Sequence, residues 1–164
     1  MDGVAFPDDF YPYALNEVSI QRRSPYMLGI DLKIDGIKLP TYWADGLIIA
    51  TPTGSTAYSL SVGGPIMTPN AKGLIISPIA PHNLNMRPII VPDSAELELS
   101  LSMASEDVML TVDNKELIIP SNSVVKLKKG EFTMKTASFG REGFFYALRE
   151  KLLWGADRRN EEII

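Results

Sequence analysis

The sequence contains no cysteine, a single histidine and no apolar run of the roughly 20 residues needed to cross a bilayer. Without cysteine, the 164-residue chain has no disulfide bond, no cysteine-ligated zinc site and no thiol nucleophile. Because His82 is the only histidine, a metal site built from several histidines is excluded as well. The net charge of −4 argues against a surface that binds nucleic acid or an anionic membrane.

The remaining composition indicates one soluble domain. Apolar residues make up 45% of the chain, which is enough for a buried core and argues against disorder. The first ten residues include three aspartates and no basic residue, so they lack the basic start and apolar run of a signal peptide. We therefore expect a cytoplasmic protein.

Much of the sequence alternates between apolar and polar residues, which is typical of half-buried β-strands. In Met27–Ile34 and again in Ala95–Met103, every second residue is apolar. Asp35-Gly36 follows the first of these segments as a two-residue turn that tolerates positive φ. The fold is therefore predicted to be mainly β, with antiparallel strands in packed sheets. Further predicted strands are Leu15–Arg22, Gly46–Ala50, Leu74–Ile79, Pro88–Val91, Val108–Val112, Glu116–Ile119, Val124–Leu127 and Phe132–Ala137.

Two segments are predicted helices. Residues 55–61 begin in a stretch rich in Thr and Ser, which are suited to N-capping, and they end before Gly63-Gly64-Pro65. In residues 142–154, Phe144 and Leu148 belong to a set of apolar residues at helical spacing, and Gly155 is suited to end that helix. The charge-rich residues 156–164 are expected to form a frayed tail.

The segment after the predicted strand Gly46–Ala50 is rich in hydroxyl groups and glycine. Thr51–Ser61 reads TPTGSTAYSLS and leads from the strand into the first predicted helix. Such a junction presents backbone N–H groups and hydroxyls that suit a phosphate, a ribose or a base edge. It is also consistent with an ordinary strand-to-helix connection. It is neither a P-loop nor a Gly-x-Gly-x-x-Gly motif.

Four ordered motifs resemble those of the NAD kinase family. They are Asn16-Glu17; Asp45-Gly46 with Thr51–Ser61 and Gly63-Gly64-Pro65; the run SPIAPHNL with Arg87-Pro88; and Val112-Asp113 at a later hairpin. The resemblance covers residues 13–155 and implies the β-sandwich of that family's C-terminal domain. Residues 1–12 match nothing in the family pattern.

The resemblance implies a parent enzyme that phosphorylates the 2′-hydroxyl of the NAD adenosine ribose to give NADP. Family members begin with an α/β domain whose Gly-Gly-Asp-Gly motif carries the expected catalytic aspartate, and no Gly-Gly-Asp occurs here. The chain is therefore expected to be the NAD-binding and oligomerisation domain, with no catalytic residue or metal ligand of its own, and to be inactive alone. The full enzyme is expected to use ATP with Mg²⁺ and to form a homodimer or homotetramer.

The resemblance also implies roles for individual residues. Asn16 and Glu17 would hold ribose hydroxyls, which an amide and a carboxylate both suit, although a turn residue and a solvent-facing strand residue would look the same. Asp45 would accept a hydrogen bond from the nicotinamide carboxamide, or it is a turn residue. In the proline-bracketed loop, Ala80 and His82 would help complete the site of a neighbouring subunit.

The implied adenine pocket lies in the hydroxyl-rich segment. Thr53, Thr56 and Ala57 would read the edge of the base, and the Tyr58 ring would pack against it or belong to the core. Ser61, four residues after Ala57, would reach a ligand hydroxyl or phosphate. Alternative functions are a non-catalytic nucleotide-binding or assembly module and a lipid or diacylglycerol kinase-like relative.

Overall fold

A computed structural model describes residues 7, 10–102, 107–135 and 143–156 of the chain. The chain divides into two units, residues 1–130 and 131–164, which are described separately.

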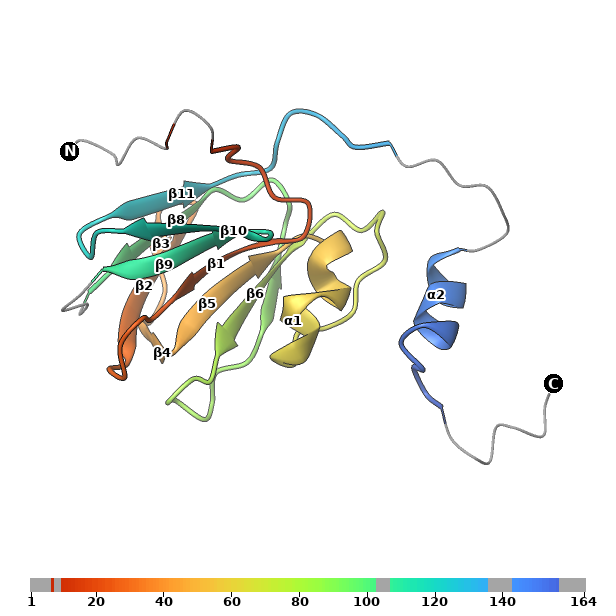
Figure 1. The fold of residues 1–164 in the computed structure, drawn as a ribbon, viewed down its shortest axis with the longest axis horizontal. Coiled ribbons are helices and arrows are strands. Elements are labelled where there is room, and N and C mark those ends of the chain that lie inside the picture. The colour runs from red at the N-terminus through yellow and green to blue at the C-terminus, as the bar shows by residue number, and fades with distance from the viewer. Residues whose placement is uncertain (1–6, 8–9, 103–106, 136–142, 157–164) are drawn as a thin grey trace. The chain divides into compact units, whose positions relative to one another are not determined.

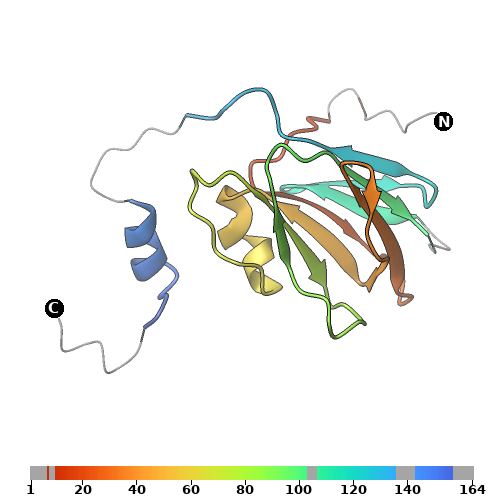
Figure 2. The ribbon, with the colours of Figure 1, turned by 180° about the vertical axis from the view of Figure 1, so that it is seen from behind.

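The first unit contains two antiparallel β-sheets (Figures 1 and 2). Sheet A has six strands in the order β10-β9-β1-β5-β6-β7, and sheet B has the order β11-β8-β2-β3 with β4 also paired to β2. The predicted mainly β, antiparallel fold is thus confirmed. The strands of sheet A are β1 (Glu17–Gln21), β5 (Gly46–Ala50), β6 (Leu74–Ile79), β7 (Ile89–Val91), β9 (Val108–Val112) and β10 (Lys115–Ile119). Those of sheet B are β2 (Leu28–Ile34), β3 (Ile37–Lys38), β4 (Tyr42–Ala44), β8 (Leu97–Leu101) and β11 (Val124–Leu127).

Alternate residues of both sheets form one hydrophobic core. Ile20, Leu47 and Leu110 of sheet A belong to the same buried cluster as Ile30 and Leu99 of sheet B. The sheets therefore pack face to face, as the alternating sequence pattern predicts. Because the core takes every second residue, the intervening residues of sheet A point to the opposite, outer face.

Two short helices cover part of that outer face, next to β5 and β6 (Figure 1). The 3₁₀-helix η1 spans Thr53–Thr56 and the α-helix α1 spans Tyr58–Ser61. The single helix predicted for residues 55–61 is therefore interrupted. Ala57, with φ −99° and ψ −131°, lies outside the helical region, and its N–H closes the η1 turn on the Gly54 carbonyl.

Most predicted strands agree with the structure, with two kinds of exception. The strands β3 and β4 were not predicted, since segments of two and three residues carry too little alternation to detect. Among the described residues of the predicted strand 132–137, namely 132–135, no strand forms. A strand needs a hydrogen-bonded neighbour, and an alternating pattern alone does not supply one.

In the second unit, helix α2 spans Phe144–Glu150, inside the predicted range of 142–154. It ends earlier than predicted, and Gly155 lies several residues beyond it with the expected positive φ of 72°. Residues 157–164 of the predicted tail lie outside the described residues. No helix in the described part of the chain is long and apolar enough to cross a membrane.

Candidate functional site

One end of sheet A gathers three segments that are distant in the sequence. The strand β1 begins there, while its antiparallel neighbours β5 and β9 end there, as the pairs Glu17–Ala50 and Val18–Val112 show. The segment before β1, the turn after β5 and the β9–β10 hairpin therefore meet at this end. The corner is defined here as Leu15–Glu17, Thr51, Gly54, Tyr58 and Asp113.

The turn after β5 holds the carbonyl groups of the segment before β1. The Thr51 N–H donates to the Asn16 carbonyl at 2.8 Å, and the Thr51 hydroxyl donates to the Leu15 carbonyl at 2.6 Å. Gly54 packs directly on the same backbone, since a Cβ at this position would lie only 2.1 Å from the Asn16 carbonyl oxygen. Only glycine fits this close approach, which explains the glycine of the TPTG run without any ligand.

The β9–β10 hairpin holds the N–H groups of the same segment. The Asp113 carboxylate accepts hydrogen bonds from the backbone N–H groups of Leu15 (2.8 Å), Asn16 (2.7 Å) and Glu17 (3.1 Å). Asp113 also donates its own N–H to the Glu17 carbonyl at 2.9 Å. It lies in a two-residue turn with φ 52°, a conformation that aspartate tolerates better than most residues.

Glu17 places a carboxylate in this corner, and the described residues supply only part of the hydrogen bonds that it can accept. The residue is 9% exposed, and its Oε2 atom has no hydrogen-bond partner among the described residues. Burial and, secondly, the nearby charge of Asp113 raise the pKa of Glu17 above 4.5, while a hydrogen bond from the Tyr58 N–H opposes the shift. A buried acceptor without a donor costs about 1–3 kcal/mol, so a ligand hydroxyl would be favourable here.

Tyr58 connects the corner to the other end of β1. Its ring is half-buried and packs beside Ile48 and Ile75 on the outer face of sheet A. Its hydroxyl lies 3.4 Å from the side-chain oxygen of Gln21, whose amide donates to Ser19 at 2.9 Å. The ring therefore contributes to packing and also remains partly accessible, so the two predicted roles are compatible.

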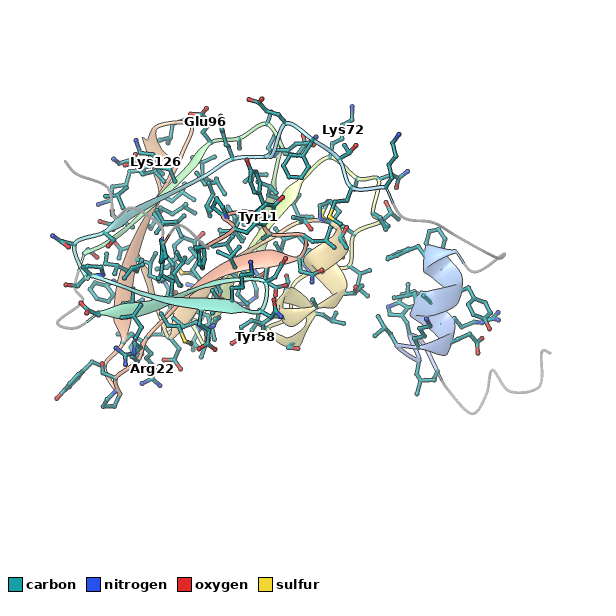
Figure 3. All side chains as sticks on the ribbon, turned by 45° about the horizontal axis from the view of Figure 1, so that its top comes forward. Tyr11, Arg22, Tyr58, Lys72, Glu96 and Lys126 are labelled. Carbon is teal, nitrogen blue, oxygen red and sulfur yellow. The ribbon has the colours of Figure 1, made fainter. Side chains whose placement is uncertain are left out.

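Asp45 lies near the far end of β1. The carboxylate forms a two-point ion pair with Arg22, with nitrogen–oxygen distances of 2.8 and 3.1 Å (Figure 3 labels Arg22). Glu17 and Arg22 are five positions apart along an extended segment, which corresponds to about 17 Å. Asp45 is therefore not a free acceptor, and a ligand amide would share its carboxylate with Arg22.

The loop after β6 lies at the same end of sheet A as Asp45. The Asp45 N–H donates to the Ile79 carbonyl at 2.9 Å, and the His82 N–H donates to the Trp43 carbonyl at 2.8 Å. Ala80 has a φ of 44°, a left-handed conformation that costs a non-glycine residue about 1–2 kcal/mol. Ala80 and His82 are both exposed, so they are accessible to a ligand or another chain.

The structure divides the predicted site residues into three groups, two at the ends of sheet A and one on the two short helices. Asn16, Glu17 and Tyr58 lie at the corner, whereas Asp45, Ala80 and His82 lie toward the other end of sheet A. On the two short helices, Thr56 donates to the Thr53 carbonyl at 3.5 Å. Ala57 separates the helices, and Ser61 is exposed at the end of α1.

The sequence did not predict the contacts made by Thr51, Gln21 and Arg22, and it placed Asp113 only at a hairpin. A turn aspartate carries no sequence signal for a bond to a backbone 97 residues away. Among the described residues, no group of three or more His, Asp or Glu residues could hold a metal ion.

Comparison with known proteins gives consistent matches. Residues 15–139 match the family model of the ATP-NAD kinase C-terminal domain. The chain is 44% identical over 149 residues to the NAD kinase of Flavobacterium psychrophilum and 45% identical over 149 residues to that of Bacteroides fragilis. Each match covers 90% of this chain and 51% of the relative, so the chain spans about half the length of these curated relatives.

Two solved structures share the fold. An NAD kinase from Archaeoglobus fulgidus in complex with ATP matches with a TM-score of 0.66 and 31% identity, over 73% of this chain and 46% of the other. Yeast NADH kinase complexed with NADH matches with a TM-score of 0.70 and 28% identity, over 88% of this chain and 45% of the other.

Proposed function

Because the chain belongs to the NAD kinase family, we propose that it forms the dinucleotide-binding part of an enzyme that phosphorylates the 2′-hydroxyl of the NAD adenosine ribose. The observation that carries the proposal is the buried Glu17 oxygen, beside Asn16 and Tyr58, to which none of the described residues donates a hydrogen bond. A ribose offers two adjacent hydroxyls, and a carboxylate next to an amide can bind both.

The dinucleotide would extend along the outer side of β1. At the corner, Asn16 and Glu17 would bind ribose hydroxyls, while Thr53, Thr56, Ala57 and Tyr58 would form the adenine pocket. At the other end, Asp45 would accept from the nicotinamide carboxamide. The separation of about 17 Å between Glu17 and Arg22 suits a ligand with a nucleoside at each end.

The contribution of this chain to catalysis would be positioning. Phosphoryl transfer depends on alignment and charge stabilisation rather than on covalent chemistry by the protein. The general base and the contacts to ATP and Mg²⁺ would come from a Gly-Gly-Asp-Gly-bearing domain outside this chain, because no such motif occurs here. Ser61 would reach a ligand hydroxyl or phosphate at the end of α1.

The proposal includes a cytoplasmic homo-oligomer, a dimer or a tetramer. Ala80 and His82 are exposed on the loop after β6, where they could complete the site of a neighbouring subunit. The strained φ of Ala80 is supporting evidence, since strained backbone tends to occur at binding sites.

The binding claim is tested by calorimetric titration of the chain with NAD. We expect weak binding that Asn16→Ala or Tyr58→Ala reduces at least tenfold, because each removes a direct contact. The matched control is Asn122→Ala, an exposed asparagine in the β10–β11 turn, which should leave binding unchanged. Equal binding by all variants would show that the ligand occupies another place.

A second experiment separates the proposal from its alternatives. With NAD and Mg-ATP, the chain alone should form no NADP, whereas robust turnover would show that the catalytic base lies within these residues. Binding of NAD distinguishes a dinucleotide site from a lipid kinase-like relative. Activity restored by adding the Gly-Gly-Asp-Gly-bearing half of a relative would argue against a purely non-catalytic module.

A further inference from the structure

We propose that Asp113 is a positioning residue for the dinucleotide: its carboxylate holds the backbone of Leu15–Glu17 so that the side chains of Asn16 and Glu17 face the ligand. Asp113 would touch no ligand itself. The inference rests on the proposed function, because it requires Asn16 and Glu17 to bind the ribose.

The geometry of the Leu15–Glu17 backbone supports this role. Leu15 and Asn16 precede β1, so the ladders of sheet A do not hold them in place. Thr51 binds the carbonyl groups of Leu15 and Asn16, and Asp113 binds the N–H groups of all three residues. The two sets of contacts come from opposite neighbours of β1 and fix the direction of each peptide plane.

The choice of an acid at this position is informative. A carboxylate offers two oxygens and about four lone-pair sites, so it can satisfy three converging N–H groups, which a neutral amide cannot. The negative charge of Asp113 also lies near Glu17 and disfavours the ionised form of the Glu17 carboxyl group. An acid that served only to shape the hairpin would incur this repulsion with no benefit, since asparagine and glycine fit the same φ.

The chain contains a matched control in Asp35. This residue also lies in a two-residue hairpin turn, with φ 49°, and its carboxylate accepts a backbone hydrogen bond from Glu96 at 2.9 Å. Its hairpin joins β2 to β3 in sheet B, whereas the corner belongs to sheet A. Asp35→Asn therefore measures the general effect of weakening the hydrogen bonds that an aspartate in a hairpin turn accepts from the backbone.

The test compares Asp113→Asn, Asp113→Gly and Asp35→Asn in the full 164-residue chain. Asparagine retains one acceptor and glycine retains none, and both accommodate positive φ, so the hairpin is preserved in at least one variant. Amide hydrogen exchange is measured by NMR without ligand, and NAD affinity is measured by calorimetry. Thermal unfolding confirms that each variant is folded.

We expect both Asp113 variants to accelerate exchange of the Leu15, Asn16 and Glu17 amides. They should also weaken NAD binding, about tenfold for Asp113→Asn and more for Asp113→Gly. Asp35→Asn should leave the exchange rates of these amides and the NAD affinity unchanged, even if it lowers the unfolding temperature as much as the Asp113 variants do.

Three results would contradict the inference in different ways. Unchanged exchange at the three amides would show that Asp113 does not hold the segment. Faster exchange with NAD affinity within twofold of the unsubstituted chain would show that the segment needs no such support for binding. If the unsubstituted chain binds no NAD, the proposed function fails first and the positioning role fails with it.

Discussion

Glu17→Gln should make the ligand-free protein more stable and its ligand binding weaker. The unsubstituted chain buries the Glu17 carboxylate near the like charge of Asp113, and within the described part of the chain one of its oxygens has no hydrogen-bond partner. Glutamine has nearly the same shape and its oxygen can still accept from the Tyr58 N–H, but it carries no charge. The amide NH₂ needs a partner just as the carboxylate oxygen does, but it has no charge to desolvate and is not repelled by Asp113, so we expect a gain of about 1 kcal/mol at pH 7.

The pH dependence gives this prediction a definite sign. The folded state raises the pKa of Glu17 above 4.5, so the folded chain binds a proton more tightly than the unfolded chain. The stability of the unsubstituted chain therefore falls as pH rises from about 4.5 through the folded-state pKa. Below pH 4.5 both states become mostly protonated, so the charge-dependent part of the difference between the variant and the unsubstituted chain should shrink.

Thermal unfolding of the ligand-free chain at pH 4 and pH 7 tests the prediction. A gain of about 1 kcal/mol corresponds to an increase of about 2–4 °C in the unfolding temperature for a chain of this size. The control is Glu116→Gln, an exposed glutamate on the same outer face of sheet A, which should change little at either pH. A Glu17→Gln variant that is less stable at pH 7 would refute the account of a strained carboxylate.

Two further predictions concern packing. Gly54→Ala should lower the free energy of unfolding by about 1–3 kcal/mol and weaken NAD binding, because the added methyl would displace the Asn16 carbonyl. Denaturant unfolding measures the loss of stability, and it should show no such loss for the control Gly143→Ala, where a Cβ meets nothing within 4 Å. Ile30→Ala should cost about 2–5 kcal/mol, since this side chain is fully buried between the sheets. The same measurement on Ile37→Ala, 70% exposed, should give less than about 0.5 kcal/mol, and equal losses would mean that the core is assigned wrongly.

The strands could be predicted because burial on one face of a sheet leaves a period of two in the sequence. Gly46–Ala50, Leu74–Ile79 and Val108–Val112 agree with the structure at both ends. The interruption at Ala57 and the close packing of Gly54 against Asn16 could not be predicted, because residues 55–61 carry no local signal for either. Local propensity contains no information about that contact.

The candidate site could be predicted in part. Asn16, Glu17 and Tyr58 follow from the family motifs, and the structure brings them together. The bonds from Asp113 and Thr51 to the segment before β1 depend on strand order in sheet A, which the sequence pattern does not reveal. The ion pair between Arg22 and Asp45 is hidden for the same reason.

The position of β9 between β1 and β10 has a consequence for how the corner arises during folding. Asp113 is separated from Asn16 by 97 residues, so the corner is among the most non-local features of the first unit. Contacts of such high sequence separation require closure of a long loop and form slowly compared with local hairpins. Ligand competence should therefore appear late in refolding, after β9 has joined sheet A, and a truncated chain that stops before the β9–β10 turn would lack it.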